Sequence, residues 1–173
     1  MKEKELVVEV GFLLNKNFKY YDKMLKNNGL SLIFSCKTHD VYFAKTKNFE
    51  GLSEKQIKNS CIRLRNPQKK DAIKIKNLLN EGYIKVFDTT KKDFHYANST
   101  MKSRVQLQKI NKIGLVVYYD NPDYYKYPLE EQRKRLIDEL NSYGFNFTKE
   151  DLGIDKLRTL YCGKPFFSKN QNG

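Results

Sequence analysis

Two segments of the chain carry apolar residues at the spacing of three or four that is typical of an amphipathic helix. The first helix is expected over residues 17–26, where the apolar positions are Phe18, Tyr21 and Leu25. The second helix is expected from Pro128 to about Tyr143, with an apolar stripe at Leu129, Leu136, Ile137 and Leu140. Residues 27–29 supply a stop for the first helix and Gly144 a C-cap for the second.

Eight further segments alternate apolar and polar residues with the period of two that indicates strands. These segments are Leu6 to Leu14, Leu30 to Cys36, Asp40 to Ala44, Cys61 to Arg65, Ala72 to Leu78, Tyr83 to Phe87, Ser103 to Gln108 and Ile113 to Tyr119. The pattern predicts an α+β chain with an antiparallel, strand-rich core. No segment repeats along the chain, so we expect one domain over residues 1–165 and a flexible polar tail over 166–173.

Several of these predicted strands place cations on one face only. The pairs at the i, i+2 spacing are Arg63 with Arg65, Lys74 with Lys76, and Lys102 with Arg104. One interpretation is a sheet with a single solvated cationic face. The other is an antiparallel eight-stranded β-barrel whose lumen is lined by these cations and whose apolar outer face is covered by the helices. Closure of the barrel would also remove the exposed edges of a long antiparallel sheet.

Charge and cysteine content limit the functional classes. The chain has 173 residues with 33 Lys and Arg against 20 Asp and Glu, a net charge of +13 that favours an anionic partner. A coding bias toward Lys and Asn would produce the same excess. Three cysteines without CxxC spacing indicate neither a disulfide framework nor a zinc site. With no apolar run long enough for a membrane span and no signal-peptide pattern, we expect a cytoplasmic protein without a membrane partner.

Cations from separate strands can share one volume only when a polyanion fills it. A linear triphosphate meets this requirement, because arginines grip phosphate oxygens bidentately and lysines act as point charges along the phosphate chain. Phosphoryl transfer also uses a divalent cation held by carboxylates. Glu9 and Asp120 are the candidate ligands for Mg²⁺ or Mn²⁺, and a solvent-facing strand position is the alternative interpretation of Glu9.

The order of these segments resembles the CYTH superfamily, the triphosphate tunnel enzymes that include class IV adenylate cyclases, thiamine triphosphatases and inorganic tripolyphosphatases. Thr38 to Phe43 resembles the family's Asp-x-Tyr-Phe strand, and Cys61 to Arg65 its Leu-Arg-x-Arg strand. Ile73 to Lys76 is similar to the lysine-bearing strand, and Lys102 to Arg104 to the Lys-x-Arg strand. The resemblance covers most of the chain and implies a triphosphate tunnel with a divalent metal.

The resemblance also implies further site residues. It adds Lys85 and Arg158 to the phosphate contacts and gives Tyr161 the place of an aromatic side chain that closes the tunnel. The family's N-terminal Glu-x-Glu-x-Lys strand is matched by residues 7–11, which keep Glu9 and have Gly11 in the place of the lysine. The family's acidic strand in the C-terminal half is replaced by residues 118–120, which end in Asp120.

Three functions follow from these residues. The first is hydrolysis of a triphosphate-containing small molecule such as tripolyphosphate, a nucleoside triphosphate or thiamine triphosphate, with cyclisation of ATP as the related alternative. The second is binding of a nucleotide or polyphosphate without turnover, by a monomer or a homodimer. The third, which we rank lower, is nucleic-acid binding with stacking on the tyrosines between residues 118 and 127. His39 and His95 have no partner in the sequence that would identify either as a general base.

Overall fold

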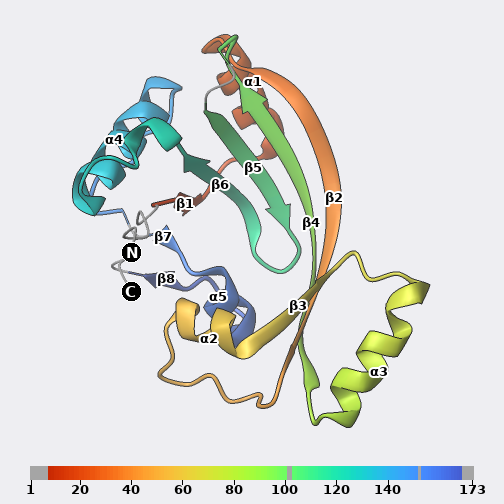
Figure 1. Cartoon of the computed structure of the whole chain (residues 1–173). Coiled ribbons are helices and arrows are strands. Elements are labelled where there is room, and N and C mark those ends of the chain that lie inside the picture. The colour runs from red at the N-terminus through yellow and green to blue at the C-terminus, as the bar shows by residue number, and fades with distance from the viewer. Residues whose placement is uncertain (1–7, 101–102, 152, 169–173) are drawn as a thin grey trace.

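The computed structural model describes residues 8–100, 103–151 and 153–168 and is dominated by one curved antiparallel sheet (Figure 1). The sheet has six strands in the order β1-β6-β5-β4-β2-β3. Their bounds are β1 Val10–Leu13, β2 Ser31–Ala44, β3 Cys61–Arg65, β4 Ile84–Ala97, β5 Arg104–Ile110 and β6 Gly114–Asp120. The two long strands, β2 and β4, pair along most of their length and bend together around the C-terminal part of the chain (Figure 1).

The predicted eight-stranded closed barrel is not confirmed. Within the described residues, β1 and β3 are the two edges of an open sheet, and β7 (Gly153–Ile154) pairs only with β8 (Phe167–Ser168). β7 packs beside β1 without joining its hydrogen-bonded ladder. The expected flexible tail over 166–173 includes the paired strand β8. Residues 169–173 lie outside the described part of the chain.

Both predicted helices are present. α1 spans Phe18–Asn27, with the Asn17 side chain accepting a hydrogen bond from the Tyr20 amide at the N-terminus. α4 spans Leu129–Ser142 and carries two glutamates in its first turn. Two shorter helices were not predicted: α2, Glu54–Ser60, and α5, Lys156–Cys162. The capping box of Ser53 with Gln56 is the sequence signal that marks the start of α2.

The predicted strand over residues 72–78 is wrong, because these residues form the helix α3, Ala72–Asn80. Ile73 and Ile75 are two residues apart, which is the spacing of residues that share one face of a strand. In the structure Ile75 and Leu78, three residues apart, pack on the core while Ile73 is 74% exposed. Helical spacing therefore describes the buried positions, and Lys74 and Lys76 lie on this helix.

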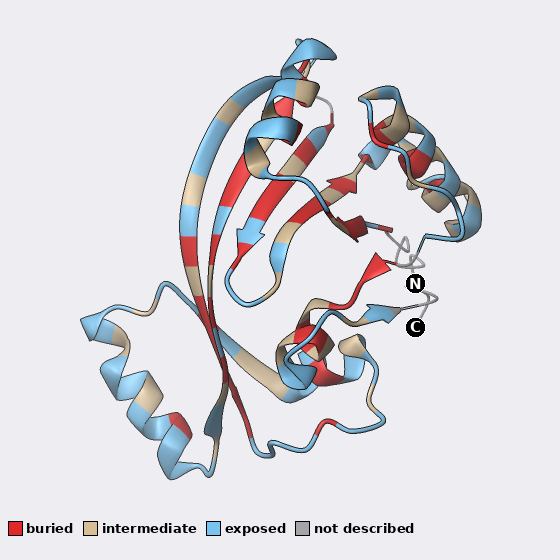
Figure 2. Cartoon of the chain, turned by 180° about the vertical axis from the view of Figure 1, so that it is seen from behind, coloured by how far each residue is buried: buried red, intermediate tan, exposed pale blue. Residues whose placement is uncertain are grey.

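The sheet has two faces that the helices cover differently. On the outer face, α1 and α4 enclose the largest core, which includes Leu25, Tyr96, Leu107 and Leu140. α3 covers the same face farther along, over β2 and β3. On the inner face, Ile57 of α2 and Leu157 of α5 pack against Tyr42 and Phe87. In Figure 2 the buried residues lie along the strands and in parts of the helices that pack on them.

No helix in the described ranges is long and apolar enough to cross a membrane. Cys36, Cys61 and Cys162 are free thiols in this structure.

Candidate functional site

Strand pairing assembles polar residues on the inner face of the sheet. Direct cross-strand partners share a face, so the pairs Arg65 with Asp40 and Arg63 with Tyr42 lie on the same side as Ala44. Val8 and Val10 are buried in the outer core, so Glu9 between them faces inward. Helices α2 and α5 add charged residues from the opposite side. We call this set the inner cluster; its members are Glu9, Asp40, Glu54, Lys58, Arg63, Lys91, Tyr118, Asp120, Asp155 and Lys156.

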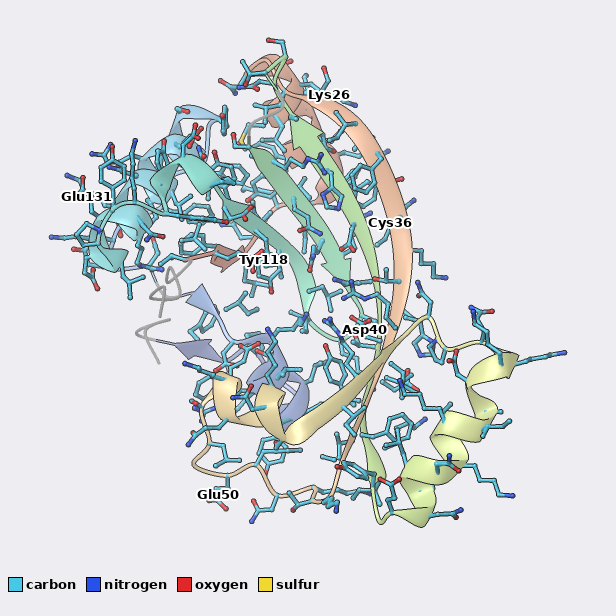
Figure 3. The ribbon with its side chains drawn as sticks, in the orientation of Figure 1. Lys26, Cys36, Asp40, Glu50, Tyr118 and Glu131 are labelled. Carbon is cyan, nitrogen blue, oxygen red and sulfur yellow. The ribbon has the colours of Figure 1, made fainter. Side chains whose placement is uncertain are left out.

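The inner cluster is a single electrostatic unit. The charges of Asp120, Lys58, Lys91 and Lys156 act on the pKa of Glu9. The charges of Glu54 and Asp40 act on the pKa of Lys156. Figure 3 shows Tyr118 and Asp40 on the side of the sheet that faces α2 and α5. Residues from β2, β3, β4, β6, α2 and α5, together with Glu9 just before β1, therefore contribute to one mixed-charge region.

Two carboxylates of the inner face are used to hold cations in place. Asp40 is 1% exposed and accepts hydrogen bonds from Arg65 at 2.9 Å from Nε and 3.2 Å from a terminal nitrogen. Burial opposes ionisation of Asp40, but the hydrogen bonds and the charge of Arg65 outweigh it and lower the pKa of this carboxyl. Asp93 lies 3.5 Å from Lys91, and both side chains of this pair are buried.

Several buried polar atoms around Lys91 have no hydrogen-bond partner among the residues that the structure describes. They include Thr38 Oγ1, Thr89 Oγ1 and Asp93 Oδ1. Thr38 is the cross-strand partner of Lys91, and Thr89 is that of Asp40, so these hydroxyls belong to the same inner face. Buried polar groups are satisfied by protein, water or ligand. This region is therefore suited to contact a polar ligand.

The acidic members form two pairs. Desolvation and the neighbouring Asp120 carboxylate raise the pKa of Glu9. Asp120 accepts a hydrogen bond from the Tyr125 hydroxyl at 3.0 Å. The second pair joins α2 to α5: desolvation, followed by a hydrogen bond and charge repulsion from Asp155, raises the pKa of Glu54 to about 8. This raised pKa favours the protonated form of Glu54 near neutral pH.

Positive charge also accumulates on the inner face. Burial, and next the like charge of Lys91, lower the pKa of Lys156. Arg63 is exposed and forms a hydrogen bond with Tyr42. Lys58 of α2 acts on the same carboxylate, Glu9, as Lys156 does. No ion pair within the described ranges includes Lys58, Arg63 or Lys156, so their charge is available to an anion.

Only some of the predicted phosphate-binding residues share this face. Arg63 and Arg65 lie there, and Arg104 is the cross-strand partner of Asp120. Lys102 lies outside the described residues. Lys74 and Lys76 do not join the arginines, because α3 carries them on the outer face of the sheet.

The remaining predicted contacts have other surroundings. Lys85 is exposed on β4 and pairs with Asp88 at 3.1 Å, beside His39 at 2.6 Å from the same carboxylate. The guanidinium of Arg158 lies 3.8 Å from the centre of the Phe166 ring. Tyr161 packs edge-on against the Phe49 ring, and both residues line a small pocket of about 220 Å³.

The two histidines do not enter the inner cluster as a base. His39 pairs with the aspartate described above. His95 stacks on Phe34 with ring centroids 4.1 Å apart, and burial lowers its pKa. Sequence reasoning missed the members of the inner cluster that come from the unpredicted elements, which are Glu54, Lys58, Lys91 and Asp155. In the sequence, Lys156 is only a further positive charge close to Arg158.

Gly11 explains the place of the Tyr118 ring. A Cβ atom built at Gly11 would lie 2.5 Å from Tyr118 Cε1, which is closer than van der Waals contact allows. The aromatic ring thus lies directly over the backbone of Gly11, and cations from other elements line the inner face.

The described residues contain no group of three or more His, Cys, Asp or Glu side chains that could hold a metal ion by themselves. Glu9 and Asp120 are a pair of neighbouring carboxylates on the inner face. Mg²⁺ is held in many sites by one or two carboxylates together with substrate phosphates and water. The pair fits that kind of shared coordination and does not fit a site built of protein ligands alone.

Solved structures share this fold. No protein-family profile and no curated protein sequence matches the chain. The protein PH1012 of Pyrococcus horikoshii aligns with a TM-score of 0.56 and 16% identity over 82% of this chain and 92% of that one. A conserved hypothetical protein of Pyrococcus furiosus aligns with a TM-score of 0.54 and 13% identity over 80% and 91%. Identities this low show a common fold alone.

A candidate adenylate cyclase of Vibrio parahaemolyticus also aligns, with a TM-score of 0.48 and 13% identity over 79% of this chain and 87% of that one. This lower TM-score carries no argument about function. The evidence for function comes from the inner cluster itself.

Proposed function

We propose that the inner cluster binds the triphosphate group of a small molecule and hydrolyses it. The observation that carries this proposal is that Lys58, Arg63 and Lys156 meet on one face and form no ion pair with a carboxylate of the described ranges. These cations come from α2, β3 and α5, so the fold itself brings them together. Like charges arranged in this way favour a ligand that carries several negative charges.

The shape of the ligand follows from the residue types. Arg63 presents a planar fork that suits two oxygens of one phosphate, whereas the two lysines act as point charges on neighbouring phosphates. The unpartnered hydroxyls of Thr38 and Thr89 can each donate a hydrogen bond to a phosphate oxygen. A linear triphosphate, such as tripolyphosphate or the triphosphate of a nucleotide or of thiamine, has the matching charge and length.

A divalent cation, Mg²⁺ or Mn²⁺, would accompany the substrate, with Glu9 and Asp120 as its protein ligands. The ion would neutralise charge that develops on the phosphate oxygens. The cations of the inner cluster orient the phosphate chain. Hydrolysis requires a water molecule to attack the terminal phosphorus in line with the departing oxygen, which leaves as diphosphate or as the nucleoside diphosphate.

Binding without hydrolysis is the second candidate, and two observations favour it. Arg65 and Lys91 are already paired with carboxylates. The Tyr118 ring lies over Gly11, where the related motif carries a lysine. Both features reduce the positive charge available for transition-state stabilisation, while leaving Lys58, Arg63 and Lys156 to bind phosphate.

The test uses purified protein with tripolyphosphate, ATP and thiamine triphosphate, each with Mg²⁺, Mn²⁺ or a chelator. Phosphate, pyrophosphate and cyclic nucleotide are measured together, and ligand-induced thermal stabilisation is measured alongside. Metal-dependent release of phosphate supports the hydrolase, cyclic AMP with pyrophosphate supports the cyclase alternative, and stabilisation without product supports binding alone. Neither turnover nor stabilisation with any of these compounds would remove triphosphate as the ligand.

Arg63→Gln and Lys74→Gln separate the inner cluster from the overall charge. Both substitutions remove one positive charge from an exposed side chain, but only Arg63 lies on the inner face. We expect Arg63→Gln to weaken triphosphate binding by about tenfold or more, in keeping with a charge-assisted hydrogen bond. Lys74→Gln should bind as the unmodified protein does. Equal losses in the two variants would mean that the inner face is not the binding site.

A further inference from the structure

A second concentration of positive charge lies on the outer face of the sheet, away from the inner cluster. Lys37 on β2, Lys92 on β4 and Lys109 on β5 are direct cross-strand neighbours in one row. Neighbouring strands are about 4.8 Å apart, so the row is about 10 Å long. Like charges placed directly opposite one another destabilise a sheet unless another charge compensates them.

These three lysines line an open groove of about 680 Å³. The groove is bounded by Asn17 and Phe18 at the start of α1 and by Asn111 in the turn between β5 and β6. None of the residues that line it is acidic. No ion pair in the described part of the chain includes any of the three lysines. We call this surface the lysine groove.

Aromatic rings hold the lysines of the groove in position. The Phe18 and Phe94 rings are in contact, with centroids 4.1 Å apart. Lys109 Nζ lies 4.6 Å from the centre of the Phe18 ring, and Lys92 Nζ lies 5.0 Å from that of Phe94. These cation–π contacts place two of the charges over an apolar floor, and Phe94 itself is buried.

We propose that the lysine groove binds the phosphate backbone of a single-stranded nucleic acid. The row of point charges matches a chain of regularly spaced phosphates, and it contains no arginine fork that would select one phosphate geometry. The groove is open, so a polymer can pass through it, whereas a small molecule would be enclosed on too few sides. The side-chain NH₂ groups of Asn17 and Asn111, which border the groove, can donate hydrogen bonds to phosphate oxygens. Binding is independent of sequence.

Lys91 of the inner cluster also borders the groove, but its ammonium group pairs with Asp93 on the inner face, so the two sites use different free cations. The two proposals can therefore be tested independently. The side chains of Lys37, Lys92 and Lys109 project from the outer face together with Phe94, which belongs to the outer core. Substitution of the three lysines leaves the inner cluster in place. Arg63→Gln, in turn, leaves the lysine groove unchanged.

The experiment measures binding of a fluorescent twelve-nucleotide oligo(dT), and of oligo(U), to the full chain by anisotropy between about 30 and 200 mM salt. Three phosphate contacts on a single strand predict a slope of about −2 in a plot of log K against log salt concentration. The variant Lys37→Gln/Lys92→Gln/Lys109→Gln should lose most of this slope and bind at least tenfold more weakly at the lowest salt. Each single substitution should reduce the slope by about 0.7.

The control is Lys69→Gln/Lys70→Gln/Lys76→Gln, which removes the same charge from exposed residues near and on α3. It should bind as the unmodified protein does. An equal loss in the control would mean that total charge, and not the groove, attracts the strand, and would overturn the proposal. So would unchanged binding by the groove variant, absence of binding at 30 mM salt, or equal binding of a poly-glutamate peptide. Thermal unfolding of both variants confirms that they are folded.

Discussion

The carboxyl pair that joins α2 to α5 makes the stability of the protein depend on pH in a defined direction. Folding raises the pKa of Glu54 from an ordinary value of 4.5 to about 8, first through desolvation and then through Asp155. In the unfolded chain this carboxyl is free of both influences. Between these two pH values the folded protein binds about one proton more than the unfolded chain does, so folded-state stability falls as pH rises.

The magnitude follows from linkage. One proton of difference corresponds to a slope of at most about 1.4 kcal/mol per pH unit. Below about pH 4.5 the carboxyl is protonated in both states, so its titration no longer changes the free energy of unfolding. Because Glu54 is only partly buried and solvent screens its charge, we expect a total change in the free energy of unfolding of about 1–3 kcal/mol between pH 5 and 8.

Glu54→Gln removes the titration and keeps a side chain that can donate a hydrogen bond to Asp155. Urea unfolding at pH 5, 6, 7 and 8 is the assay. The variant should match the unmodified protein at pH 5 and exceed it in stability by about 1–3 kcal/mol at pH 8. Glu50→Gln is the matched control, because Glu50 is exposed and lies in the loop before α2. Parallel pH profiles of the unmodified protein and Glu54→Gln would refute the reasoning.

Two further substitutions test the packing of the inner face. Asp40→Asn should lower the free energy of unfolding by about 1–3 kcal/mol at neutral pH, because it weakens the double hydrogen bond to Arg65 from a buried position. Asp138→Asn, the same change at an exposed position of α4, should cost less in the same urea titration. Gly11→Ala should destabilise the protein because the added Cβ meets the Tyr118 ring. Tyr118→Ala in the same chain should recover part of the lost stability. Strictly additive effects in a double-mutant cycle would contradict this contact.

The sequence predicted best the elements whose two faces differ strongly in polarity. β3 has the predicted bounds, Cys61–Arg65, because Leu64 is buried on one face while Arg63 and Arg65 are exposed on the other. The α4 helix was predicted within one residue at each end because its buried positions repeat at helical spacing. In these elements burial follows the local pattern of residues.

The inner face was harder to predict because burial there does not follow polarity. The prediction ended the strand of β4 at Phe87, yet the strand continues to Ala97 through the buried polar residues Thr89, Lys91 and Asp93. A sequence pattern treats such residues as solvent-facing. Their burial is set by the tertiary fold, for which the local sequence carries no signal.

The same reason hides the carboxyl pair. Glu54 stands in the first turn of α2, where an acidic residue is ordinarily explained by the helix dipole, and Asp155 is the N-cap of α5. Each residue thus has a sufficient local role. Only the packing of α2 against α5 brings the two carboxyls together and adds Lys156 beside them. Local signals therefore account for Glu54 through the helix dipole and for Asp155 as an N-cap, and they miss the contact between the two carboxyls.

The two faces of the sheet differ in how their positive charge is compensated, and this difference predicts how each binds. On the inner face, cations and carboxylates alternate, and Arg65 and Lys91 are already paired, so geometry and protonation determine which anion fits. In the lysine groove no carboxylate is present, so binding depends on the sum of charges. Surface attraction of that kind is screened by salt, whereas contacts made in a desolvated region are screened less. Raising the salt concentration should therefore release an oligonucleotide from the groove well before it releases a triphosphate from the inner cluster.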